Sequence, residues 1–394
     1  MKVKNQIISL VAIVVFCVGY QNVSAQTVNI GEFTKKFNVI TTAVPFLQIS
    51  PDARAGGMAD AGCAISPDAN SVHWNAAKLT FAEKKSALSL SSAPWLRTLV
   101  PDVWLHYVSG YKQIDNKSAW GASMRYFTLG SIQFTDISGN PLQMFNPSEL
   151  AVDGAYSRKL SEQFSVGVAL RFIYSNLAGN ISLQGGQQAK PGIAGAGDLS
   201  FYYTTKEFNL KAKKSLFTWG LNISNIGNKI TYTNSTNRDF IPINLRTGVS
   251  LKSEIDDYNA IMVNLEFTKL LVPTRPQYDS ITGAIKKGRD PNVAVAQGMF
   301  QSFYDSPGGF REEMREINTM IGFEYWYAKQ FAARAGYFNE SPFKGNRRYF
   351  TFGIGLRYNV FGLDFAYLIP LLQRNPLENT LRFSLQFNFA DGKK

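Results

Sequence analysis

Residues 380–389 read TLRFSLQFNF, and apolar and polar side chains alternate along them without interruption. Leucine or phenylalanine occupies every odd position from 381 to 389, and a polar residue occupies each even position between them. Successive side chains of a β-strand point to opposite faces, so one face of this strand is wholly apolar and the other wholly polar. The pattern suits either a closed sheet in a membrane or the edge of a soluble antiparallel sheet.

The same alternation recurs from residue 86 onward and is clearest in residues 164–174 and 350–358. It predicts about fourteen strands, an even number that agrees with bacterial single-chain barrels. In the strand near 103–112, Val103, Leu105 and Tyr107 share one face, and His106 is expected on the polar side. The predicted strands are residues 86–91, 103–112, 117–127, 148–159, 163–176, 196–204, 216–226, 244–252, 257–267, 318–327, 331–338, 348–358, 360–368 and 380–389.

The connections between these strands fall into two classes by position. Short ones alternate with long ones, as the periplasmic turns and extracellular loops of outer-membrane barrels do. A soluble sandwich has no reason to sort its loops in this way. We therefore predict an all-β membrane protein, a roughly 14-stranded antiparallel transmembrane β-barrel in the bacterial outer membrane. The short connections are 113–116, 160–162, 253–256, 328–330 and 359, the middling one is 205–215, and the long ones are 128–147, 177–195, 227–243 and 268–317.

Composition supports this fold class. Aromatic residues make up 13% of the chain and charged residues only 18%, whereas about a quarter of residues are charged in soluble proteins. The mean hydropathy of −0.12 argues against a bundle of membrane helices. The net charge of +12 comes without a compact basic stripe, so no nucleic-acid partner is expected. Solvated surface charge, or attraction to phosphate-bearing lipid, explains the charge better.

The first 80 residues lack the strand pattern. Residues 1–25 have a positive start, an apolar core too short to span a bilayer and a small-residue end, which predicts a cleaved signal peptide. Residues 26–40 are expected to be a polar periplasmic leader. Residues 41–80 are rich in alanine, glycine and turn motifs, which predicts a helical plug inside the barrel of residues 81–394.

Charged residues at the polar strand positions are interpreted as a structural ion-pair network inside the barrel, because a charge facing lipid is costly. Asp52 and Arg54 of the plug are available as further partners, and Asp52 is expected to cap a turn. The expected set is Arg125, Asp153, Arg171, Asp198, Arg246, Glu266, Glu324, Arg334, Arg357, Asp364 and Arg382.

Motifs of catalysis and metal binding are absent from the sequence. It has no HExxH, CxxC, GxSxG or P-loop pattern and only two histidines, His73 and His106. No metal, cofactor or enzymatic activity is expected. A hydrolase that combines His106 with Ser89 or Ser123 is a less favoured alternative. The long connection 268–317 contains a charged stretch that suits a short helix, and its length favours a surface cap that contacts a partner.

Residues 44–79 carry three linked motifs: VPFLQISPDARAGGMADAG at 44–62, SPDA at 66–69 and WNAAKL at 74–79. They resemble the opening of the PorV family, the FadL-like outer-membrane barrels of the type IX secretion system. The family pattern is PFL-x-I-x-PDAR-x-x-GMG-x-x-G, then S-PDA, then W-N-P-A-K. Ala59 replaces the second glycine of GMG, and Ala76 replaces the proline. The motif residues, expected to be structural, are Pro51, Asp52, Arg54, Gly56, Gly57, Met58, Asp68, Trp74 and Asn75.

The resemblance implies a carrier and not an enzyme. Proteins of this family collect secreted cargo at the translocon barrel through the cargo's C-terminal signal domain. They shuttle it to a surface complex, where a sortase-like protease removes the signal and attaches the cargo to lipopolysaccharide. Cargo is expected to dock on the extracellular loops, with 268–317 the first candidate. Two alternatives stay open: FadL-like uptake of hydrophobic small molecules, and lipopolysaccharide O-deacylation, which needs His106 near a serine and a carboxylate facing the membrane.

Overall fold

The computed structural model describes residues 37–97, 100–135, 138–179, 188–234, 238–372 and 375–389. The chain divides into two units, residues 1–37 and 38–394, and the description below concerns the second unit. The expected signal peptide and most of the expected leader therefore lie outside the described residues. No helix in the described part of the chain combines the length and apolar character that crossing a bilayer requires.

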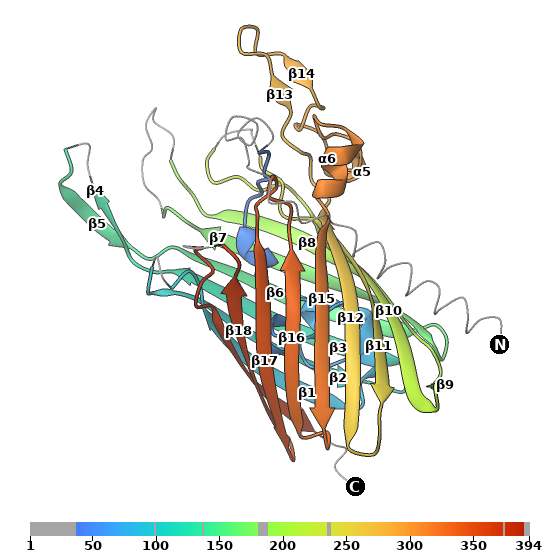
Figure 1. Ribbon diagram of the computed structural model, residues 1–394. Helices are drawn as coiled ribbons and strands as arrows, with labels where there is room; N and C mark the ends of the chain where they lie inside the picture. Colours follow the sequence, from blue (N-terminus) through green and yellow to red (C-terminus); the bar gives the residue numbers. More distant parts are fainter. Residues whose placement is uncertain are drawn as a thin grey trace. The chain divides into compact units, whose positions relative to one another are not determined.

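Fourteen antiparallel strands form a closed barrel, which confirms the predicted fold class (Figure 1). Sequential strands pair with each other, and the last, β19 (Leu381–Phe389), pairs with the first, β1 (Ser86–Pro94), so the sheet closes. The other barrel strands are β2 (Val103–Gln113), β3 (Ser118–Leu129), β6 (Ser148–Lys159), β7 (Phe164–Asn176), β8 (Gly192–Thr204), β10 (Lys213–Gly227), β11 (Asn244–Glu254), β12 (Asn259–Leu270), β15 (Asn318–Tyr327), β16 (Phe331–Asn339), β17 (Arg348–Tyr358) and β18 (Phe361–Pro370).

The structure adds short strands that the alternation did not predict. Two hairpins lie outside the barrel, and β9 (Phe208–Leu210) pairs only with β10. Strand β8 begins at Gly192, four residues before the predicted start, because glycine and alanine, which are poor β-formers, make up its first residues except Ile193. The hairpins are formed by β4 (Ile132–Thr135) with β5 (Pro141–Phe145) and by β13 (Gln277–Tyr278) with β14 (Ile285–Lys287).

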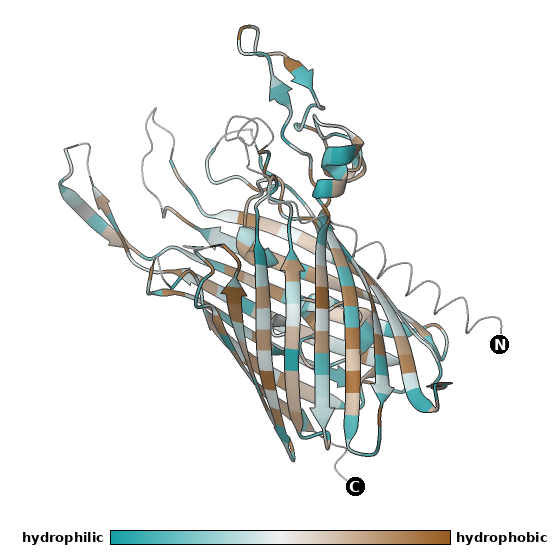
Figure 2. Cartoon of the chain, in the orientation of Figure 1, coloured by the Kyte–Doolittle hydropathy of each residue, from teal (hydrophilic) through white to brown (hydrophobic). Residues whose placement is uncertain are grey.

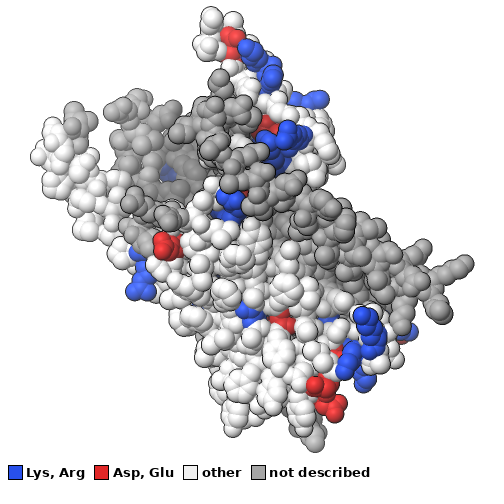
Figure 3. Space-filling model, in the orientation of Figure 1, with Lys and Arg blue, Asp and Glu red and all other residues white. Residues whose placement is uncertain are grey.

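Apolar and polar residues alternate along most strands (Figure 2), and large apolar side chains are exposed on the barrel wall. In β19, Phe383 is 48% exposed while Arg382 and Ser384 on either side are buried, as the alternation predicted. In Figure 3, charged side chains gather at the two ends of the barrel, and the wall between them is mostly uncharged. A surface of this kind matches the hydrocarbon layer of a bilayer.

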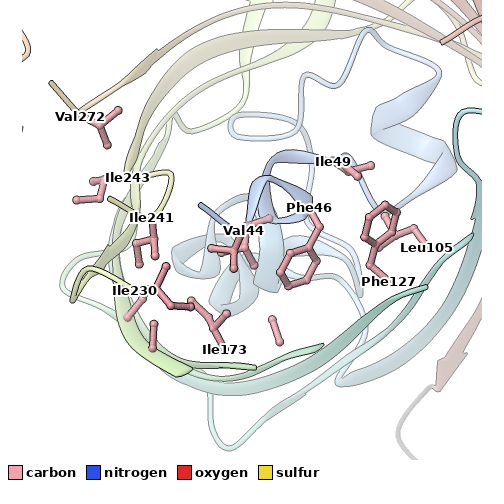
Figure 4. Packing of buried hydrophobic residues seen from close by; sticks show 14 of the residues in the cluster. Val44, Phe46, Ile49, Leu105, Phe127, Ile173, Ile230, Ile241, Ile243 and Val272 are labelled. Atoms are coloured by element: carbon pink, nitrogen blue, oxygen red, sulfur yellow. The ribbon is translucent and has the colours of Figure 1, made fainter. Parts of the chain in front are cut away.

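The orientation predicted for β2 is wrong. Its apolar face, with Val103, Leu105 and Tyr107, points into the barrel, and His106 points outward. The cause is an apolar core inside the barrel near the long connections, where Leu105 and Phe127 of the wall pack against Phe46 (Figure 4). The interior is therefore apolar at that end. The polar strand faces had been expected to line the whole interior.

Residues 38–82, here called the inner segment, run through the interior of the barrel. The segment contains η1 (Pro45–Gln48), α3 (Ala53–Gly56), α4 (Ser71–Trp74) and η2 (Ala76–Phe81), and most of its side chains are buried. Short helices and turns were expected here. Its hydrogen bonds reach inward-facing groups of strands all around the barrel, which are Arg125, Ser165, Ser200, Thr218, Glu266, Glu324, Thr351 and Ser384.

The inner segment enters at the end with the long connections. The amide of Asn38 donates to the carbonyl of Phe343 in the β16–β17 connection, at 2.9 Å. Near the opposite end, Gln113 donates to the carbonyl of Ala82 at 2.9 Å, next to the short β2–β3 turn. The described part of the expected leader, residues 38–40, therefore lies at the long-connection end. The prediction had placed it on the periplasmic side.

Candidate functional site

Arg54 connects the inner segment to the wall. Its guanidinium forms a bidentate pair with Glu324 of β15 at 3.1 and 3.0 Å, and a second pair with Asp68 at 3.1 Å. It also donates to the carbonyl and hydroxyl oxygens of Ser66. All of these partners are polar groups in a buried environment, so Arg54 and the acidic residues neutralise each other there.

Asp52 joins the two halves of the inner segment. It begins α3 as its N-cap, accepting from the amide of Ala55 at 2.9 Å, and it also accepts from the indole of Trp74 at 2.6 Å. The side chain of Asn75 accepts from the amide of Ala77 and donates to the carbonyl of Phe201 in β8. Each carboxylate oxygen of Asp52 thus accepts a hydrogen bond from within the inner segment.

Close approach to the wall explains the glycines after Pro51. A Cβ on Gly56 would lie 2.5 Å from the guanidinium of Arg382, and one on Gly57 would lie 3.1 Å from the Cα of Gly353. Met58 is fully buried beside these glycines. Ala59, which replaces a family glycine, has a left-handed backbone with φ of 59°, a region in which glycine is favoured.

The charged residues predicted to face the interior do face it, and all but one lie in ion pairs. Arg125 is the exception among the described residues: it donates to the carbonyls of Phe46 and Leu47 and to the ring of His73. Its position beside the apolar core explains the difference. The pairs are Arg171 with Asp153 and Asp198, Arg246 with Glu266, Arg334 with Glu324 and Asp364, Arg357 with Asp364, and Arg382 with Asp60 of the inner segment.

The two serines considered for the less favoured hydrolase alternative lie on the other side of the wall from His106. Ser89 and Ser123 point inward, whereas His106 points outward and its Nδ1 lies 3.1 Å from the hydroxyl of Ser92. In the described part of the chain, no carboxylate makes a hydrogen bond or ion pair with His106. No three histidine, cysteine or acidic side chains are grouped as metal ligands among the described residues.

A folded cap stands at the long-connection end of the barrel, formed by residues 273–317 (Figure 1). It contains the β13–β14 hairpin and two short helices, α5 (Val295–Gln301) and α6 (Phe310–Arg315). Phe300 is 72% exposed, Phe310 78% and Met314 51%. Large apolar side chains that are exposed on a surface segment outside the bilayer are typical of a protein-binding surface.

Buried charges fix the other side of the cap to the barrel rim. The ammonium of Lys269, at the end of β12, pairs with Glu313 at 3.0 Å and Glu316 at 2.5 Å. Lys344, from the β16–β17 connection, pairs with Glu312 at 2.6 Å and with Glu316 at 2.8 Å. Against the cost of burial, these two lysines hold the pKa of Glu316 below its ordinary value.

Asp305 lies beside this cluster without a cation of its own among the described residues. One carboxylate oxygen accepts from the amide of Thr274 at 3.1 Å, and the other has no hydrogen-bond partner. Burial, together with the nearby carboxylates of Glu313 and Glu316, raises the pKa of Asp305 to about 6. The attachment of the cap therefore contains a group that titrates near neutral pH.

Sequence reasoning missed the residues of this cluster. The charged stretch 310–317 was expected to form a helix, but nothing in the pattern of the sequence indicated its partners. Lys269 and Lys344 are separated from it in the chain. Lys269 is the second-last residue of β12, and Lys344 lies in the β16–β17 connection, where there is no two-residue period. Only their position next to long connections was available as a signal.

Several solved structures are similar to this chain at low sequence identity. The toluene transporter TodX of Pseudomonas putida is 12% identical with a TM-score of 0.45, covering 84% of this chain and 95% of its own. The toluene transporter TbuX of Ralstonia pickettii is 11% identical with a TM-score of 0.42, covering 86% and 98%. A FadL homologue of Pseudomonas aeruginosa is 11% identical with a TM-score of 0.42, covering 90% and 100%. No curated protein matches the chain.

These similarities are too weak to assign the chain to a family, but a family model does assign it. It matches residues 32–277, more than half of the chain, and so includes the whole inner segment and the barrel strands through β12. The model is described as type IX secretion system protein PorV. This chain is an outer-membrane β-barrel that belongs to the PorV family of the type IX secretion system.

Proposed function

We propose that this protein carries cargo of the type IX secretion system from the translocon to the attachment complex at the cell surface. In this proposal it binds the C-terminal signal domain of a secreted protein at the translocon barrel and delivers it to the sortase-like protease and attachment complex. The protein is then an integral outer-membrane carrier, exported through a signal peptide of residues 1–25 that is cleaved, and not an enzyme. The intact mass of the purified protein tests that cleavage.

The observation that carries the proposal is an exposed apolar cap on the rim of an occupied barrel. The inner segment is hydrogen-bonded to strands all around the interior, and we infer that it acts as a plug. A folded cargo domain has no path through such a barrel, so cargo has to be handled on the outside. The cap offers a surface for this contact, because large apolar side chains provide most of the binding energy of protein interfaces.

The first experiment is mild detergent extraction from native membranes, followed by mass spectrometry of the co-purifying proteins. We expect secreted proteins that share a C-terminal signal domain, or a very large barrel partner. Recovery of the barrel alone with bound fatty acids would support the alternative of hydrophobic-molecule uptake.

Substitutions on the cap test the contact surface. Changing Phe300, Phe310 and Met314 together to serine should lower cargo co-purification tenfold or more, since each tenfold corresponds to about 1.4 kcal/mol and buried aromatic contacts commonly exceed that. The matched control is Met144→Ser in β5, an equally exposed apolar residue (68%) on a different hairpin. Equal loss in both variants, or none in either, would argue against the cap.

The Ser92–His106 contact favours the deacylase alternative, because both side chains are on the outward face. A serine hydrolase also needs a group to orient the histidine, and no described carboxylate does so. We expect His106→Ala to leave the acylation of lipid A unchanged when extracted lipid is examined by mass spectrometry. A gain of acyl chains in the variant would establish the activity.

A further inference from the structure

The outward face of the barrel has an apolar groove of about 550 Å³ across β6, β7, β8 and β10. Val152, Leu170 and Phe172 form its sides, and they are 43%, 75% and 50% exposed. Gly195 of β8 lies between them and Ile226 of β10. The groove is in the apolar wall, nearer to the long connections than to the short turns, because Gly195 is only three residues from the start of β8.

The sheet is irregular along one side of this groove. The pairing of β8 with β10 shifts between Ile223 and Ile226, and Asn225 has a left-handed backbone with φ of 62°. Asn225 is turned inward: its amide donates to Asp198 at 2.8 Å and its side chain donates to the carbonyl of Pro242 at 2.8 Å. A bulge of this kind interrupts the ladder and bends the strand.

Buried polar contacts close the inner side of the groove. Arg171 is only 7% exposed, pairs with Asp153 and Asp198, and donates to the side chain of Asn225. These groups satisfy each other, so a passage through the wall at this point would require breaking a buried ion-pair network. The groove is therefore open toward lipid and closed toward the barrel interior.

Packing against the described residues does not explain the glycine in the groove. A Cβ added to Gly195 would meet only the side-chain oxygen of Asn228, at 3.8 Å, which is an ordinary contact. Its φ is not in the left-handed region either. A glycine inside a strand weakens the sheet and often marks a position where another molecule approaches the backbone closely.

Two lysines lie beyond the groove on the side of the long connections. Lys190 is two residues before β8, and Lys229 is two residues after β10. Lys190 donates to the neutral side chain of Asn234, and Lys229 lies over the ring of Phe240 at 4.2 Å. Neither forms an ion pair with a described carboxylate. At about 3.3 Å per residue of extended chain, Lys190 lies at most roughly 17 Å from Gly195.

We propose that this groove binds an acyl chain of an anionic, phosphate-bearing lipid, with the chain over Gly195 and the headgroup beside Lys190 and Lys229. The lipid belongs to the leaflet on the side of the long connections. An apolar groove in the membrane-facing wall selects a hydrocarbon chain. The two lysines at its end, which form no ion pair with the described residues, select a negative headgroup. The site needs only the membrane position of the barrel, so it stands or falls independently of cargo transport.

Native mass spectrometry of the full-length protein, released from detergent containing phosphatidylglycerol or phosphatidylcholine with identical chains, tests the site. We expect the wild type to retain phosphatidylglycerol more strongly. Gly195→Leu should reduce retention of both lipids several-fold by filling the groove. Lys190→Ala with Lys229→Ala should abolish the preference for phosphatidylglycerol while phosphatidylcholine retention stays unchanged.

The matched control is Ala333→Leu, which adds a similar side chain to the outward face of β16, far around the barrel from β8. Heat-modifiable gel migration shows whether each variant forms a barrel, and Gly195→Ala replaces Gly195→Leu if the latter does not. Equal lipid retention by the wild type, the Gly195 variant and the Ala333 variant would overturn the proposal. Retention without headgroup preference would overturn the role of the lysines.

Discussion

Arg54 is a buried residue of the inner segment that pairs with two acidic groups, one in the barrel wall and one in the inner segment itself. Glu324 belongs to the wall, whereas Asp68 belongs to a later turn of the inner segment. Removing the guanidinium would leave two buried carboxylates with fewer partners. Glu324 would keep Arg334 at 2.8 Å, but Asp68 would lose its only ion pair among the described residues.

Arg54→Ala should therefore lower barrel stability by roughly 3 kcal/mol, the lower range for breaking a buried ion pair. The measurement is the temperature at which the folded band disappears on a semi-native gel. Lys206→Ala is the control, since its pair with Glu162 is exposed and exposed pairs contribute little. Normal stability combined with failed secretion would assign Arg54 to cargo handling instead of structure.

At the scale of elements, the cap is held by charges and its stability should depend on pH. The folded-state pKa of Asp305, about 6, lies above the ordinary 3.8, so protonation stabilises the folded cap as the pH falls from 7 through 6. The pKa of Glu316 is lowered, so its contribution is present above the ordinary value of 4.5 and is lost only as the pH falls below that range.

Amide hydrogen exchange in α5 and α6 should therefore slow between pH 7.5 and pH 5.5, after correction for the intrinsic pH dependence of exchange. Asp305→Asn removes the titrating group and should make protection nearly constant over this interval. Asp279→Asn is the matched control in the same cap, because its exposed carboxyl has a pKa that is lowered by turn hydrogen bonds. A persistent pH dependence in Asp305→Asn would contradict this account.

The sequence predicts the barrel strands better than it predicts the contacts that hold the cap to the barrel. Alternation identified the wall because lipid and interior impose opposite chemistry on neighbouring residues, as in β19. It failed to orient β2, since both faces of that strand meet apolar surroundings. The sequence could not predict the ion pairs that hold the cap for another reason. Lys269 and Glu316 are far apart in the chain and come into contact only through tertiary folding.

At the scale of the whole molecule, the direction in which the inner segment enters the barrel determines on which side of the membrane its first residues are accessible. If the long connections face the cell exterior, as in outer-membrane barrels, the exposed residue Thr41 faces it as well.

Thr41→Cys should react with a membrane-impermeant maleimide on intact cells. Native Cys63 is fully buried and should stay silent. Asp257→Cys, in a short turn, should react only after the cells are opened. Labelling of Asp257→Cys but not Thr41→Cys on intact cells would reverse the orientation.

The contacts of the inner segment also constrain the order of assembly. Asp60 pairs with Arg382, and the amide of Ala53 donates to the hydroxyl of Ser384, so the earliest part of the barrel unit contacts the last strand. That strand also completes the seam with β1. The segment cannot be threaded into a ring that is already sealed. The sheet must therefore fold around the inner segment, which acts as a template for barrel closure. The final strand can close correctly only when this template is already in position.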